Sequence, residues 1–147
     1  MKKIFILMLL SLSLFSNDII VKQSNCSVDE TVQNIRNILR AKGLSIFATI
    51  NHGGNAKSIG MNLNESKMIV FGNPKLGTAL MQQDMRIGLD LPLRILVYTD
   101  VDGTTKMAYR DGSWLANKHV LNIPKKINKI NTAMDNITTR AGKCIKE

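Results

Sequence analysis

Two histidines are the side chains in this 147-residue sequence best suited to metal or proton chemistry. His52 stands in the turn-like segment 51–54, and His119 ends the segment 114–119. An imidazole can hold a metal ion or move a proton when a carboxylate or thiol lies beside it. No His-x-x-His or Cys-x-x-Cys spacing brings two such ligands together. The sequence therefore predicts no metal site, no cofactor and no catalytic residue.

The segment GNPKLGT, residues 72–78, has the two glycines and the threonine of a phosphate-binding loop. Such a loop needs a lysine directly after its second glycine. Here Lys75 lies inside the segment, and Pro74 removes one backbone donor. Asn73 as N-cap and Pro74 at the first helical position explain the same residues as a helix start. Nucleotide binding is therefore not predicted.

Two other motifs resemble metal sites. The segment DVDG, residues 100–103, begins like a calcium loop, but Tyr109 stands where a later acidic ligand is needed, and a hairpin turn explains the segment. Met81 and Met85 lie one helical turn apart and could offer thioethers to copper. Core packing is the ordinary role of methionines at this spacing.

The N-terminus has the pattern of a secretory signal peptide. Lys2 and Lys3 precede an apolar run over residues 4–10, and small and polar residues follow. An uncleaved anchor is the alternative, although the apolar run is shorter than the roughly 20 residues that span a bilayer. We predict a cleaved signal peptide over residues 1–16, a single domain over 17–147, and a periplasmic or secreted protein.

The two cysteines suit that compartment. Cys26 directly precedes a predicted helix, and Cys144 continues the apolar stripe of the last one, which directs it inward. An even number of cysteines in an exported chain permits a disulfide. The alternative, a redox-active pair, lacks the Cys-x-x-Cys spacing that tunes thiol reactivity. We predict a structural Cys26–Cys144 bridge.

Strands and helices alternate along the predicted domain. We expect strands near 19–21, over 44–50 and 68–71, and over 93–98 and 105–109 around a tight turn. Helices are expected from the capping box at Ser27 to a left-handed turn at Gly43, from Pro74 to about Met85, and over 114–119; residues 56–63 form one or two further turns. A central hairpin among interleaved helices predicts an α+β domain.

The last predicted helix, residues 124–146, is long and basic. Its apolar residues recur at steps of four and three: Ile123, Ile127, Ile130, Met134, Ile137, Ala141 and Cys144. This stripe favours docking on the domain's own sheet, with a coiled-coil seam as the alternative. The helix also carries much of the formal net charge of +9. Nucleic acid is a poor partner for this charge, because the chain is predicted to be exported and only 5% of its residues are aromatic. We expect the charge to make at most weak contact with an anionic surface.

One long pattern resembles a known family. The segments IVFGNPKLGTALMQ (69–82) and GLDLPLRILVYTDVDGTTKMAYRDGSWLANKH (88–119) closely resemble the core signature of the bacterial and archaeal domain-of-unknown-function 302 family, and IFATINHGGNAKSIGMNL (46–63) is similar to an earlier part of it. The resemblance spans about residues 28–121. Ala79 departs from the proline usual in the pattern, and the helix after Pro124 lies outside it.

This resemblance implies a curved, mainly antiparallel sheet with helices packed on it, a TATA-binding-protein-like arrangement, and a homodimer. The activity of the family is unknown, so it implies no catalytic residue. Its polar signature positions fall here on a candidate shared pocket, whose residues are His52, Asn73, Asp90, Tyr109 and His119. Asn73 and Asp90 are equally suited to cap a helix and a turn.

Two functions follow from these observations. The first is a non-enzymatic exported module that binds a small molecule or another protein. The second is a metal-dependent or redox accessory protein or enzyme, which requires His52 and His119 to converge with a carboxylate or thiol.

Overall fold

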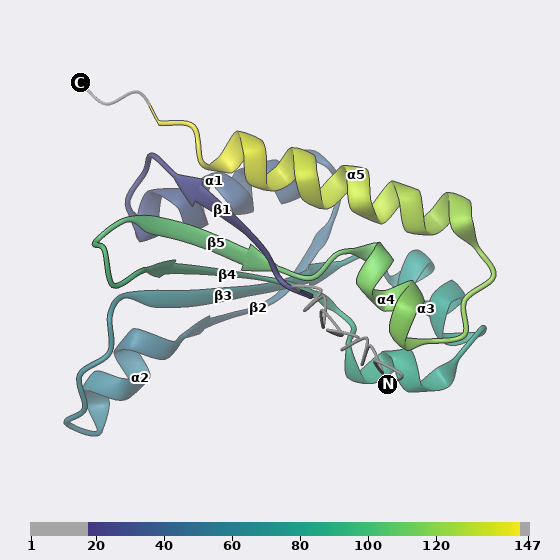
Figure 1. The fold of residues 1–147 in the computed structure, drawn as a ribbon, viewed down its shortest axis with the longest axis horizontal. Coiled ribbons are helices and arrows are strands. Elements are labelled where there is room, and N and C mark those ends of the chain that lie inside the picture. Colours follow the sequence, from purple (N-terminus) through teal and green to yellow (C-terminus); the bar gives the residue numbers. More distant parts are fainter. Residues whose placement is uncertain (1–17, 145–147) are drawn as a thin grey trace, which may run out of the picture.

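Figure 1 shows the computed structural model, which describes residues 18–144. Five antiparallel strands form one sheet in the order β1-β5-β4-β3-β2. The bounds of the strands are β1 Ile20–Ser24, β2 Ser45–Asn51, β3 Ser66–Gly72, β4 Leu93–Thr99 and β5 Thr105–Tyr109. The helices are α1 Val28–Ala41, α2 His52–Ser58, α3 Pro74–Met81, the 3-10 helix η1 Met85–Leu89, α4 Gly112–Lys118 and α5 Pro124–Ala141. The α+β fold with a long C-terminal helix is confirmed.

The core lies between one face of the sheet and the two long helices. Ile69, Ile95 and Tyr109 are neighbours in register on β3, β4 and β5, and all three are buried. The predicted stripe of α1 packs over this face, with Val28, Val32, Ile35 and Leu39 all buried. In Figure 1, α1 and α5 lie side by side along the same side of the sheet.

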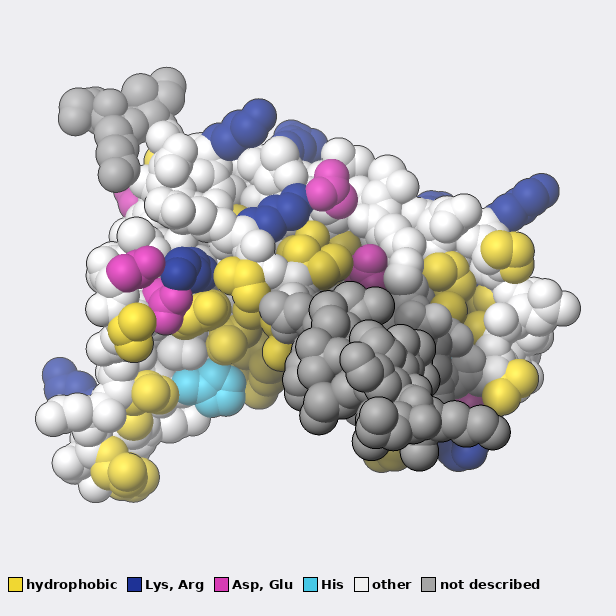
Figure 2. Space-filling view, viewed as in Figure 1, with side chains coloured by type: hydrophobic (Ala, Val, Ile, Leu, Met, Phe, Trp, Pro, Cys, Tyr) yellow, Lys and Arg dark blue, Asp and Glu magenta, His cyan; other side chains and the backbone are white. Residues whose placement is uncertain are grey.

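The apolar stripe of α5 is buried in the domain's own core rather than left as a seam. Its buried side chains are Ile127, Ile130, Met134, Ile137 and Ala141. The opposite side of the helix carries charge, and Figure 2 shows Lys and Arg side chains along the ridge that α5 forms. No helix within residues 18–144 is long and apolar enough to cross a bilayer.

Two helix boundaries in the middle of the chain differ from the sequence prediction. Helix α2 begins at His52, where a turn was expected, because the Asn51 side chain accepts from the Gly54 amide at 2.8 Å and caps it. Helix α3 ends at Met81 rather than near Met85, because Asp84 caps η1 as a separate helix. The left-handed residue after α1 is Gly43, as predicted, with φ of +64°.

The last helix also ends earlier than the predicted residue 146. Helix α5 stops at Ala141, and Gly142 passes so close to β1 that an added Cβ would lie 3.2 Å from the Gln23 carbonyl oxygen. The Asn25 amide donates to the Gly142 carbonyl at 2.9 Å. Cys144 therefore lies beyond the helix, not on its apolar stripe. The extra residues let the chain turn toward Cys26.

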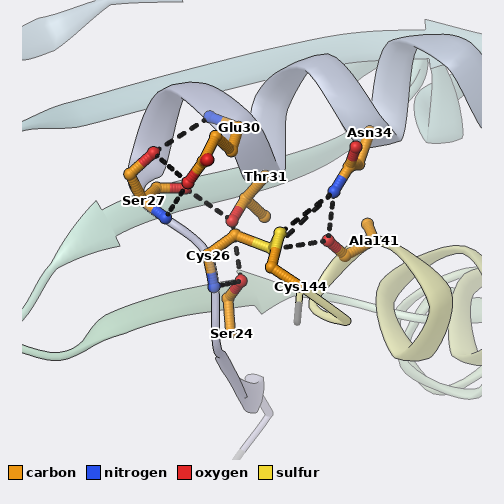
Figure 3. Close-up of a disulfide and its surroundings, with 8 residues drawn as sticks. All are labelled: Ser24, Cys26, Ser27, Glu30, Thr31, Asn34, Ala141 and Cys144. Atoms are coloured by element: carbon orange, nitrogen blue, oxygen red, sulfur yellow. Dashed lines mark hydrogen bonds between the residues drawn. A yellow bond between two sulfur atoms is a disulfide. The ribbon is translucent and has the colours of Figure 1, made fainter. Parts of the chain in front are cut away.

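A disulfide between Cys26 and Cys144 joins the first and last helices (Figure 3). Beside it, the Asn34 side chain of α1 donates to the Ala141 carbonyl at 3.1 Å, at the end of α5. Ser27 and Glu30 form the predicted capping box at the start of α1. The start of α1 and the end of α5 are thus held together at the disulfide.

We expect the double substitution Cys26→Ala/Cys144→Ala to lower the free energy of unfolding by about 4 kcal/mol, because the bridge closes a long loop that restricts the unfolded chain. The two cysteines are 118 residues apart. Urea denaturation measures the loss. Reductant should destabilise the wild-type chain by a similar amount and leave the double variant unchanged. A wild-type midpoint that ignores reductant would contradict the bridge.

Candidate ligand-binding site

A pocket of about 300 Å³ lies where the sheet meets α4. Its floor comes from the sheet face turned away from α1 and α5. On that face Met68, Leu96 and Ala108 are neighbours in register on three adjacent strands. The remaining lining residues are Ile19, Asp90, Leu93, Arg94, Tyr109, Arg110, Trp114 and Leu115. The pocket thus joins an apolar floor to a few polar groups, which is the usual composition of a small-molecule site.

Two arginines give the wall of the pocket its positive charge. Arg94 is on β4 and shares the floor's side of the sheet with Leu96, because side chains alternate along a strand. Its Nη2 donates to the Leu89 carbonyl at 3.2 Å. Arg110 follows β5, and its Cζ lies 4.3 Å from the centre of the Trp114 ring, in cation–π contact.

Trp114 brings an unused hydrogen-bond donor. Its backbone amide donates to the Asp111 side chain at 3.0 Å, which caps α4. The indole Nε1 is buried, and in the described part of the chain it has no hydrogen-bond partner. Buried tryptophan N–H groups usually find an acceptor. This donor is therefore an unsatisfied buried polar group in a residue that lines the pocket.

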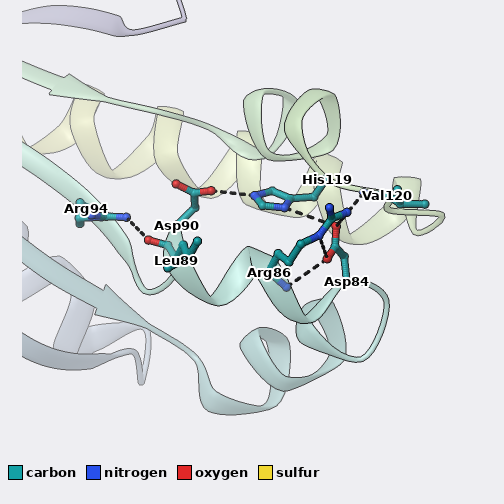
Figure 4. A network of polar contacts seen from close by, with 7 residues as sticks. All are labelled: Asp84, Arg86, Leu89, Asp90, Arg94, His119 and Val120. Carbon is teal, nitrogen blue, oxygen red and sulfur yellow. Dashed lines mark hydrogen bonds and ion pairs between the residues drawn. The ribbon is translucent and has the colours of Figure 1, made fainter.

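Asp90 is fixed in the pocket wall by His119. His119 Nε2 lies 2.7 Å from Asp90 Oδ2, and the histidine side chain is only 8% exposed (Figure 4). The second ring nitrogen, Nδ1, lies 3.6 Å from Asp84 Oδ2. Asp84 caps the start of η1 and Asp90 caps its end. The imidazole of His119 therefore lies between the two residues that cap η1 and contacts both of them.

Asp84 is the most strongly held carboxylate of this network. It forms two hydrogen bonds of 3.0 Å with the Arg86 guanidinium, and it accepts from the backbone amides of Arg86 and Val120. The Arg86 guanidinium holds the pKa of the Asp84 carboxyl well below its usual range. The contact with Val120 ties η1 to the loop that follows α4. The network positions Asp90, and each ring nitrogen of His119 lies beside a carboxylate.

The five predicted pocket residues divide into three groups. Asp90 and Tyr109 line the pocket, and His119 contacts Asp90 from behind. Asn73 caps α3 by accepting from the Lys75 and Leu76 amides, and it lines two other cavities. His52 begins α2 directly after Asn51, which pairs with Lys67 at the start of β3.

His52 and His119 therefore do not lie close together. Asp90 precedes β4, whose Leu93 pairs with Phe71 near the end of β3. Lys67 and Phe71 are about 13 Å apart along an extended strand. Among residues 18–144, no three His, Cys, Asp or Glu side chains form a group that could hold a metal ion. Met85 is 70% exposed, and Met81 lines an apolar cavity near α3.

Sequence reasoning missed Asp84, Arg94, Arg110 and Trp114. A signal was present for Arg94, which lies between partly buried Leu93 and buried Ile95 and so marks the second face of β4. Asp84 two residues before Arg86 also has the character of a helix cap. Arg110 and Trp114 lie on opposite sides of a turn, and only the path of the chain between β5 and α4 brings them together.

Comparison with known proteins identifies relatives of most of the chain. Residues 20–140 match the family described as "Domain of unknown function DUF302". A crystal structure titled "uncharacterized conserved protein DUF302 from Bacillus stearothermophilus" superposes with a TM-score of 0.68, covering 86% of this chain and 97% of that one at 16% identity. This likeness shows that the fold is shared.

The curated relatives carry another name. "Fluoride-specific ion channel FluC 1" of Brucella suis and of Brucella abortus, and "Fluoride-specific ion channel FluC 2" of Brucella melitensis, are each 36% identical over 111 residues. The match covers 76% of this chain but 41–44% of those proteins. The chain therefore spans less than half the length of the channel proteins it matches.

We expect Asp84→Asn to flatten the acid dependence of stability. Because the pKa of Asp84 is lower in the folded chain than its value of about 3.9 when unfolded, its contribution is present above pH 4 and is lost as the pH falls below that. Urea denaturation from pH 7 to pH 2.5 measures this. Wild type should lose stability more steeply than Asp84→Asn below pH 4. Parallel curves for the two proteins would contradict the assignment, and Asp111→Asn, which changes the cap of α4, is the matched control.

Proposed function

The chain belongs to the family described as "Domain of unknown function DUF302", and on this premise we propose that it is an exported, non-enzymatic module that binds a small apolar molecule with an anionic group. The observation that carries this proposal is the pocket beside α4. There an apolar floor of Met68, Leu96 and Ala108 meets two arginines and the side chain of Trp114. Guanidinium groups favour carboxylates, with which they form paired hydrogen bonds.

Asp90 limits which anions would fit. Its carboxylate lies in the same wall as Arg94 and repels a second negative charge placed beside it. The anionic group of the ligand would therefore face Arg94 or Arg110, and a hydroxyl or ammonium donor would suit Asp90. A volume of about 300 Å³ accommodates a molecule of one or two rings.

Binding is favoured over catalysis because His119 does not line the pocket. Its side chain is 8% exposed and is engaged by Asp90 and Asp84. An enzyme that uses both histidines would need His52 beside it, and His52 lies at the other end of β3. The channel activity in the names of the Brucella relatives is not proposed for this chain.

Binding is tested with benzoate as the probe and its uncharged analogue benzamide as the comparison. Trp114 is the single tryptophan of the chain, so its indole N–H gives one nuclear magnetic resonance signal from the pocket itself. We expect benzoate to shift that signal and to bind more tightly than benzamide. Arg94→Gln should weaken benzoate binding about tenfold, because it removes a charge-assisted hydrogen bond.

Arg40→Gln is the matched control, because Arg40 is an exposed arginine on α1 that does not line the pocket. It should leave benzoate binding unchanged. Equal affinity for benzoate and benzamide would contradict an anion site. A signal that benzoate does not move would contradict the pocket.

Export and dimer formation are tested by one measurement. The N-terminal pattern of Lys2, Lys3 and an apolar run supports export, and so does the disulfide, since such bonds persist in oxidising compartments. Residues 1–16 lie outside the described residues. We expect the purified protein to begin near Asn17, to weigh two hydrogens less than that sequence, and to have a native mass twice the chain. An intact N-terminus in the membrane fraction would instead indicate an uncleaved anchor.

A further inference from the structure

A second and larger cavity, of about 720 Å³, opens on the helix side of the molecule. It is bounded by α5, by the residues that follow α1 and by the start of α3. Its apolar lining consists of Leu44, Phe71, Leu76, Leu93, Ile130, Ala133, Met134 and Ile137. Gly72 and Asn73 complete it near the end of β3. We refer to this cavity as the lysine groove.

Four lysines give the groove its name. Lys42 follows α1, Lys75 is in the first turn of α3, and Lys126 and Lys129 are on α5. No acidic residue lines the groove. Within residues 18–144, none of these four has a carboxylate within salt-bridge distance, whereas Lys22, Lys67, Lys106 and Lys118 each do. The described part of the chain thus leaves the positive charge of the groove without an ion-pair partner.

The interior of the groove is apolar. Phe71, Met134 and Ile137 at its base belong to the buried core, while Leu44, Leu76 and Leu93 are partly buried and pack against that core. Lysine side chains place an apolar stem along such a surface and keep the ammonium at its edge. The groove can therefore bury an alkyl chain and place positive charge beside an anionic group at the end of that chain.

A smaller apolar cavity adjoins the groove. It measures about 250 Å³ and shares with the groove the residues Gly72, Asn73, Leu76, Leu93 and Ile130. Beyond that shared wall it is lined by Phe47, Leu80, Met81, Leu91 and Pro92, among others. Phe47 is 54% exposed there. The two cavities are thus neighbours on either side of the start of α3 and the end of β3.

We propose that the lysine groove binds one long-chain carboxylate, with its headgroup among Lys42, Lys75, Lys126 and Lys129 and its alkyl chain along the apolar base. The volume lies in the range of ligand cavities, and the positive charge complements a carboxylate. A concave groove buries a single alkyl chain on several sides, which a flat bilayer surface does not. This site lies on the opposite face of the sheet from the floor of the pocket beside α4, and Leu93 is the residue that lines both.

Calorimetric titration of the full chain with dodecanoate below its micellar concentration tests the proposal. We expect one dodecanoate per chain. Lys126→Glu/Lys129→Glu should weaken binding at least about tenfold, because it replaces two attractive charges by repulsive ones. Lys125→Glu is the matched control, since Lys125 is an exposed neighbour on the same helix that does not line the groove. It should change the affinity by less than about twofold.

Two further substitutions separate the groove from the pocket beside α4. Ala133→Trp should fill the groove and abolish binding, with thermal unfolding as the check that the variant is folded. Arg94→Gln should leave dodecanoate binding intact, and Lys126→Glu/Lys129→Glu should leave the benzoate shift of Trp114 intact. Failure of one site is thereby distinguishable from failure of the other.

Three outcomes would overturn the proposal. The first is no binding of dodecanoate to the wild-type chain. The second is equal affinity for dodecanol, which would mean that the lysines recognise no charge. The third is binding to vesicles of anionic phospholipid without binding of monomeric dodecanoate, which would make α5 a contact surface for membranes instead.

Discussion

Burial of the apolar side of α5 is the interaction on which the rest of the structure depends. Five of its side chains enter the core between α1 and the sheet. Once this side is fixed, the charged side of the helix has to face outward, and its lysines come to the edge of the groove beside α3. The same packing brings the end of the chain back to β1 and to Cys26. Because both long helices cover one face of the sheet, the other face is left to form the floor of the pocket beside α4.

The pocket beside α4 depends on a smaller element, the 3-10 helix η1. Its caps, Asp84 and Asp90, both contact His119, and Asp84 also holds Arg86 and the Val120 amide. A 3-10 helix of five residues has little stability of its own, since its hydrogen-bond geometry is poor. Side chains that fasten it at both ends therefore determine where Asp90 lies. His119 acts in this arrangement as a positioning residue.

The sequence predicted most of the fold and about half of the candidate site. Periodicity found the stripes of α1 and α5, because burial on one face of a helix dictates a spacing of three and four. It placed the end of α3 too late, because Met85 continues the apolar pattern and local spacing does not reveal that Asp84 caps a new helix. The family resemblance grouped His52 with His119, because a shared pattern in sequence carries no information about which end of a strand each residue reaches. Arg110 and Trp114 meet only through the turn between β5 and α4.

The contact between α1 and α5 also affects the order of events when the chain is made. The first long helix finds its partner only after residues 124–141 are available, more than eighty residues later in the sequence. Contacts between segments far apart in the sequence form late, because the chain between them has to be ordered first. Until α5 emerges, the apolar side of α1 can pack only against the sheet. The core between α1, α5 and the sheet is therefore completed only when the last helix of the domain is available.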